Sequence, residues 1–368
     1  MGTWHGLYQV KSKRITHYLD RWFVVKFDKA KDVGEVINEL KRDPAIEKVH
    51  GSVQIVPSEV TYTPTTRAPI NPRRLRDAND GQGPLSFSDP YLKYQWHYTT
   101  TIEQYMTFQP GADIDLFPAW EKETGDLEGT AWEGKDPKTG ETIHGRNFWA
   151  EETGQDNPNH IIAGAHGTHV AGTIAARNNN GIGVCGIAGG NGDANSGVRL
   201  MSCEIYGHDG TTETATTKYI VKAFEFAAEN GASVMNCSWG YAFDRKKYLN
   251  NENFQSIFKS QFDLLKDGID YFTDVAGCDK DGKKKPDAYM KGGLIFFASG
   301  NDSQYDIDMI PASYNRVVAV GAINSLGVPT AYMNKGPWVD VLAPGGTTET
   351  GSVNQGVLST VPSDYEYG

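Results

Sequence analysis

The chain has few cysteines, no hydrophobic run long enough to cross a membrane, and no excess of positive charge. Its four cysteines show no CxxC spacing, and three of them stand in apolar stretches, which excludes a disulfide framework and a zinc site. The formal net charge of -11 argues against nucleic acid or an anionic membrane as a partner. Residues 1–4 do not begin a signal peptide, so we expect either that a signal has been removed or that the protein stays inside the cell.

Composition divides the chain into three parts. Residues 1–60 combine two strand patterns with a helical pattern between them, which predicts a small α+β module. Residues 61–111 hold prolines without sustained periodicity, which predicts a linker, followed by an aromatic lead-in that we expect to pack on the third part. Within the linker, Arg73–Arg76 suits either a cleavage site for a trypsin-like protease or a solvated turn, and we favour the turn.

The third part, residues 112–368, alternates apolar runs of strand length with helical patterns. The runs fall at 198–205, 233–237, 294–298, 317–320 and 339–342, and the helical patterns at 214–230 and 253–275. Nearly continuous apolar strands separated by helices predict an α/β fold, a parallel sheet with helices on both faces. In such sheets functional residues gather at the carboxyl ends of the strands.

A histidine stands at the expected start of a tightly packed helix. Residues 166–176 read HGTHVAGTIAA, with helical spacing and very small side chains, after an extended polar approach. The imidazole of His166 titrates near neutral pH, which suits a base that takes a proton and returns it. The alternative is that His166 and His169 are ordinary residues of a helix start.

Two further polar blocks follow predicted strands. Asn301 stands behind Gly300 after the strand at 294–298, where an amide donor can point at a developing negative charge. An Asn-Asp turn is the alternative interpretation. Ser238, Trp239 and Gly240 follow the strand at 233–237 and offer main chain to an extended peptide.

These blocks, with the stretch from 310 to 346, resemble the blocks of the subtilisin-like serine proteases and occur in the family's order. The resemblance implies that His166 is the catalytic base and Asn301 the oxyanion-hole donor. It further implies a substrate-binding wall, a second substrate-pairing edge at 207–212, an inhibitory propeptide at 1–60 and an extracellular or cell-envelope location. The residues implied for substrate binding are Gly210, Ser238, Trp239, Gly240 and Gly300. An unrelated binding module is the alternative for 1–60.

Two members of the catalytic triad are not found where the resemblance requires them. The nucleophile block would begin at Gly368, with its serine two residues further on. The strand that carries the acid is missing at the 125/126 junction, and Asp126 is not assigned the acid's role. We expect that these pieces are missing from the sequence, come from another chain or were removed; a deleted pseudoprotease is the physically awkward alternative.

The loop at 178–184 resembles the asparagine-rich loop that binds calcium in many subtilases. It implies a structural calcium ion with Asp126, Asn179 and Asn180 among its ligands, although an Asn-Gly loop is also a generic turn. No other cofactor is required. We therefore predict a serine endopeptidase that acts on polypeptides, held as an uncleaved zymogen by its own propeptide. The rival prediction is a catalytically dead peptide-binding pseudoprotease.

Overall fold

The computed structural model describes residues 3–6, 23–26, 32–44, 46, 49, 55–57, 87–92, 95, 97–98, 131–154, 156–162, 164–193, 196–208, 213–241, 245–305, 307–347 and 356–362. Two residues of the predicted site, Asp126 and Gly210, lie outside the described residues. The 125/126 junction, most of the predicted linker and the residues from 363 onward also lie outside them.

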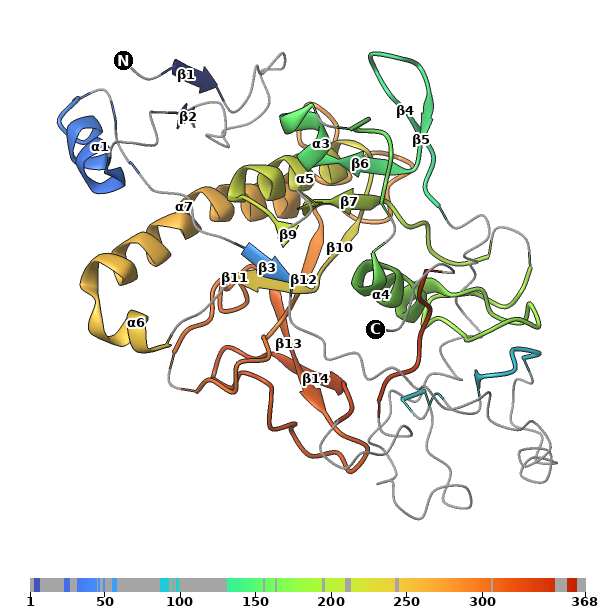
Figure 1. The fold of residues 1–368 in the computed structure, drawn as a ribbon. Helices are drawn as coiled ribbons and strands as arrows, with labels where there is room; N and C mark the ends of the chain where they lie inside the picture. Colours follow the sequence, from blue (N-terminus) through green and yellow to red (C-terminus); the bar gives the residue numbers. More distant parts are fainter. Residues whose placement is uncertain are drawn as a thin grey trace.

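A four-stranded parallel sheet forms the centre of the described fold (Figure 1). Its strands, in spatial order, are β10 (Val234–Cys237), β12 (Leu294–Ala298), β13 (Val318–Ile323) and β14 (Val341–Pro344). The register places Cys237 beside Phe297 and Phe297 beside Ala319, and all three side chains are buried. The α/β fold predicted from the apolar runs is confirmed.

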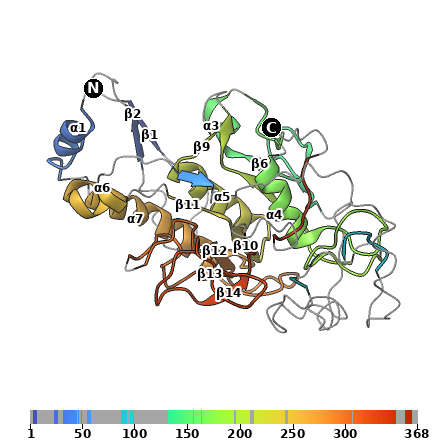
Figure 2. The same ribbon diagram turned by 60° about the horizontal axis from the view of Figure 1, so that its bottom comes forward.

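Helices α5 (Thr217–Glu229) and α7 (Glu252–Val275) pack against each other, and α7 contacts β12. The face of α5 predicted to be buried, Ile220, Phe224 and Ala227, is buried. Gly231, with φ 89°, lets the chain turn away after α5. The short helix α6 (Arg245–Asn250) precedes α7, and helix α4 (Ala165–Ala175) lies on the other side of β10 from α7 in both views (Figures 1 and 2).

A second parallel pair joins β6 (Gly145–Asn147) to β7 (Ser202–Glu204). The strand β6 was not predicted, and β7 is shorter than the apolar run at 198–205. Within the described part of the chain, β7 and β10 are not paired with each other. Asn147 ends β6 and caps helix α3 (Phe148–Thr153), because its Oδ1 accepts the Ala150 N–H at 2.8 Å. Two antiparallel pairs complete this region: β4 (Gly134–Lys135) with β5 (Thr142–Ile143), and β8 (Gly207–His208) with β9 (Glu213–Thr214).

The described N-terminal residues contain the predicted strand, helix and strand, and the two predicted strands have different pairing partners. Strand β1 (Thr3–Gly6) pairs antiparallel with β2 (Phe23–Lys26), and helix α1 (Val33–Leu40) follows, capped by Asp32. Strand β3 (Ile55–Pro57) pairs antiparallel with β11 (Trp239–Tyr241), about 180 residues away. The backbone donors and acceptors of β3 thus find their partners on a strand of the third part of the chain, and the α+β module at 1–60 stays a prediction.

The four cysteines are free thiols. Three are buried, Cys185, Cys237 and Cys278, and burial raises the pKa of the partly covered Cys203 to about 12. The buried thiols therefore pack as small apolar groups. Across the described ranges, none of the helices combines the length and the apolar content that crossing a bilayer demands.

Candidate active site

His166 is the second residue of helix α4, which begins after Gly164 without a side-chain cap, and its side chain is half-buried. One turn further on, burial lowers the pKa of His169, a hydrogen bond to the Val357 backbone raises it, and the neighbouring His166 lowers it. His169 is thus tied into the fold, while His166 stands at the helix start. The role of His166 as catalytic base stays a prediction.

The segment 356–362 lies against α4, as its dark red trace in Figure 1 shows. The Ser359 hydroxyl donates to the His169 carbonyl at 2.7 Å, and the Thr360 hydroxyl donates to the Thr168 carbonyl at 2.8 Å. A methyl group at Gly172 would overlap both hydroxyls, so this position needs glycine for close approach. These contacts fix the turn of the helix that follows His166.

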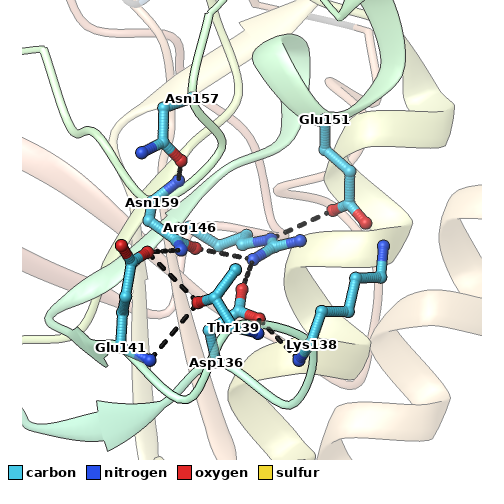
Figure 3. A network of polar contacts seen from close by, with 8 residues as sticks. All are labelled: Asp136, Lys138, Thr139, Glu141, Arg146, Glu151, Asn157 and Asn159. Atoms are coloured by element: carbon cyan, nitrogen blue, oxygen red, sulfur yellow. Dashed lines mark hydrogen bonds and ion pairs between the residues drawn. The ribbon is translucent and has the colours of Figure 1, made fainter.

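A buried ion pair contacts the chain segment that leads into α4, because Arg146 of the pair donates to Asn159 of that segment (Figure 3). Arg146 donates to Asp136 at 2.6 Å, and both side chains are less than 10% exposed. The Thr139 amide holds the pKa of Asp136 well below its usual range; burial opposes this, while the Lys138 amide and Arg146 add to it. Asp136 therefore stays ionised, and its charge is matched by hydrogen bonds on both oxygens.

Asn301 follows β12, and the residues on both sides of it are bonded to a second asparagine, Asn334, that the sequence analysis missed. Gly300 has φ 96°, and a Cβ there would overlap the amide of Asn334. Asn334 is fully buried; its Oδ1 accepts the N–H groups of Asp302 at 3.0 Å and Gln304 at 2.9 Å. The turn that carries Asn301 is therefore held by Asn334, which stands about 30 residues further along the chain. No local sequence pattern predicts this contact.

The predicted substrate wall is the edge formed by β11, and β3 lies on it. Val56 pairs with Gly240 and Pro57 with Trp239, while β3 also contacts β9. The Trp239 ring is buried and meets the Phe297 ring edge to face at 4.9 Å, which fixes the wall to the central sheet. Because Cys237 and Phe297 are register partners, the chain segments leading to Ser238 and to Asn301 leave the sheet at the same edge.

Residues 90–367 match the model of the subtilase family. The chain belongs to this family. The subtilase is 29% identical over 180 residues to a thermophilic serine proteinase of Bacillus sp. strain AK1, covering 49% of this chain and 34% of that protein. It is 26% identical over 317 residues to an extracellular protease of Xanthomonas campestris, covering 77% of this chain and 46% of that protein.

A third relative, the major intracellular serine protease of Bacillus subtilis, is 26% identical over 230 residues, or 61% of this subtilase and 55% of the relative. The chain thus spans between a third and about half of the length of these curated relatives. The similarity establishes the family and its α/β fold.

The loop expected to bind calcium is organised by Asp89, a residue that the sequence analysis missed. Its carboxylate is buried and accepts the N–H groups of Asn179 and Asn180. The amide oxygens of these asparagines accept the N–H groups of Ser88 at 3.0 Å and Ile182 at 2.8 Å. Within the described ranges there is no group of three His, Cys, Asp or Glu side chains that could hold a metal ion. The amide oxygens of Asn179 and Asn180 thus accept backbone N–H groups in this structure, and the calcium site stays a prediction.

The aromatic lead-in also supplies an unpredicted buried histidine. Gln95 exchanges two hydrogen bonds of 2.8 Å with the Cys185 backbone, and the Tyr98 hydroxyl donates to the Cys185 carbonyl at 2.5 Å. His97, only 3% exposed, stacks edge to face on Tyr98. Burial, with a smaller effect of His169, lowers the pKa of His97 to about 3. Its imidazole is therefore neutral wherever the protein is folded at ordinary pH.

Proposed function

We propose that this subtilase is a serine endopeptidase that carries its own inhibitory propeptide. The pairing of β3 with β11 supports the proposal most directly, because an N-terminal strand covers the wall expected to bind substrate. In this proposal residues 1–60 form the propeptide, 61–111 the linker and lead-in, and 112–368 the catalytic domain. The hydrogen bonds of Gln95 and Tyr98 support a lead-in that docks on that domain.

In the proposed reaction an extended polypeptide replaces β3 on the wall. His166 takes the proton of the attacking serine and later gives it to the leaving amine. Asn301 donates to the oxyanion that forms on the attacked carbonyl, with Gly300 allowing the backbone to approach. We propose that the acid and the serine of the triad lie outside these 368 residues. The separation of β7 from β10 among the described strands supports a strand missing between them.

The rival proposal, a peptide-binding pseudoprotease, keeps the wall and lacks the triad. We expect a fluorophosphonate to label the complete native protein, and His166→Ala to abolish labelling while leaving the thermal midpoint nearly unchanged. His144→Ala serves as the matched control, because the His144 side chain is exposed. Absence of label on a folded native protein would rule out the protease and leave the pseudoprotease. Peptide mapping across 125–126 and past residue 368 would locate the acid and serine independently.

We also propose a calcium ion at the loop 178–184, with Asp126, Asn179 and Asn180 among its ligands and Asp89 holding the loop backbone in place. Bound there, calcium would stabilise the loop against unfolding and take no part in proteolysis. An extracellular location is a further proposal. The name of the Xanthomonas campestris relative supports it, whereas the Bacillus subtilis relative is named as intracellular. Fractionation of the native cells decides between these compartments.

A further inference from the structure

The chain segment that leads into α4, residues 156–162, is bound by its main chain to the end of β6. The Pro158 carbonyl accepts the Asn147 backbone N–H at 2.8 Å, and the His160 carbonyl accepts the Asn147 side-chain amide at 3.3 Å. Asn147 is fully buried, so neither of its groups has water as an alternative partner. We call residues 156–162 the approach segment.

Side chains add a second set of bonds to the approach segment (Figure 3). Arg146 donates to Asn159 Oδ1 at 2.7 Å with the same nitrogen that binds Asp136, and Asn159 donates to Glu141 at 3.0 Å. The Asn159 backbone N–H is taken by Asn157 Oδ1 at 2.9 Å. The middle of the segment is therefore held by a charged network whose central ion pair is buried.

The last bond before the helix comes from β7. Glu204 Oε2 accepts the Ile162 backbone N–H at 2.8 Å. Glu204 is the register partner of Asn147, so the two residues close the carboxyl end of the β6–β7 pair together. The end of the approach segment nearest α4 is thus bound to the carboxyl end of the β6–β7 pair, as is the middle of the segment.

His166 stands four positions after Ile162, so the chain between them reaches at most about 14 Å even when fully extended. The turn of α4 after His166 is fastened independently by Ser359 and Thr360. With one side of the helix start fixed by the 356–362 segment, the bond to Glu204 sets where the chain enters the helix. We propose that Glu204 is a positioning residue for His166, acting through the Ile162 N–H. This inference rests on the proposed function for its link to catalysis.

The test compares Glu204→Ala with Glu204→Gln in the complete protein, using a fluorophosphonate as the probe. Labelling needs His166 to activate the serine, so the maximal labelling rate reports the placement of the imidazole. In Glu204→Ala we expect that rate to fall roughly 10- to 100-fold with little change in the half-saturating probe concentration. Glu204→Gln keeps an oxygen acceptor for the Ile162 N–H and should retain most of the rate. Glu252→Ala, an exposed glutamate at the start of α7, is the matched control.

Equal rates in Glu204→Ala and wild type would overturn the proposal, and so would a loss in Glu204→Gln as large as in Glu204→Ala. Should Glu204→Ala not fold, Ile162→Pro removes the donor of the same bond and should reproduce the loss of rate. If the wild type takes no label, the proposed protease function fails, and an NMR spectrum of the His166 imidazole then tests the positioning alone. Its resonances should shift in Glu204→Ala and stay near the wild-type positions in Glu204→Gln; unchanged resonances in both overturn it.

Discussion

Lowering the pH from about 8 to about 5 should destabilise this subtilase through the buried imidazole of His97. In the folded protein, burial lowers the pKa of His97 to about 3, whereas in the unfolded chain it returns to 6.5. Between these two values the unfolded state binds one proton more than the folded state, so stability falls as the pH falls. The contribution of neutral His97 to the stability is complete above pH 6.5 and is lost progressively as the pH falls toward 3.

The magnitude follows from the two pKa values. Each pH unit inside this window lowers the unfolding free energy by at most about 1.4 kcal/mol. At about pH 5 the unfolding free energy is therefore roughly 2 kcal/mol lower than it is well above the unfolded-state pKa. The partly buried His169 has its pKa lowered as well and contributes in the same direction. The contribution of His97 is therefore measured by replacing it. The comparison is between the pH dependence of the unfolding free energy in the wild type and in the variant, and not between their stabilities at one pH.

Urea unfolding of the wild type and of His97→Leu at both pH values supplies this difference. We expect the drop in unfolding free energy between the two pH values to be about 2 kcal/mol smaller in His97→Leu. His144→Leu, at an exposed side chain, is the matched control. An identical drop in wild type and His97→Leu, or an NMR titration of His97 with a midpoint near 6.5, would refute the reasoning.

Three other changes have defined outcomes. Arg146→Met leaves the buried Asp136 carboxylate without its ionic partner and should lower the unfolding free energy by about 3–5 kcal/mol. Adding Asp136→Asn should recover part of this loss, and urea titration of the single and double variants would show it. Gly172→Ala should cost about 1–3 kcal/mol, because its methyl group meets the Thr360 hydroxyl; Thr360→Ser, which keeps the hydroxyl, should not rescue it. Calcium at 100 times its dissociation constant should stabilise the loop 178–184 by about 2.7 kcal/mol, seen as a higher thermal midpoint that a chelator reverses; an unchanged midpoint contradicts the calcium proposal.

The sequence predicted the elements whose own pattern carries the information. The continuous apolar runs gave β10, β12 and β13 close to their observed bounds, because a strand covered on both faces needs apolar residues throughout. The spacing of small residues after His166 placed helix α4 correctly. The position of Asn301 directly after β12 followed from the same logic.

The strand β6 escaped prediction because its residues, Gly145, Arg146 and Asn147, are not apolar although all three are buried. Such a strand is stable only because an ion pair to Asp136 and the bonds of Asn147 replace apolar contacts. The burial of β6 therefore depended on partners that lie outside the strand.

What the sequence determined by itself, then, is the set of local elements and the order of the family's blocks, because periodicity and capping act between residues that are close along the chain. Only the tertiary structure decided that β3 pairs with β11, that Asp89 and Asn334 hold loops distant from them in sequence, and that Glu204 binds Ile162. Each of these is a hydrogen bond between groups 30 or more residues apart. A polar group pairs with whichever partner the folded chain brings within about 3 Å, and no short-range pattern encodes that choice.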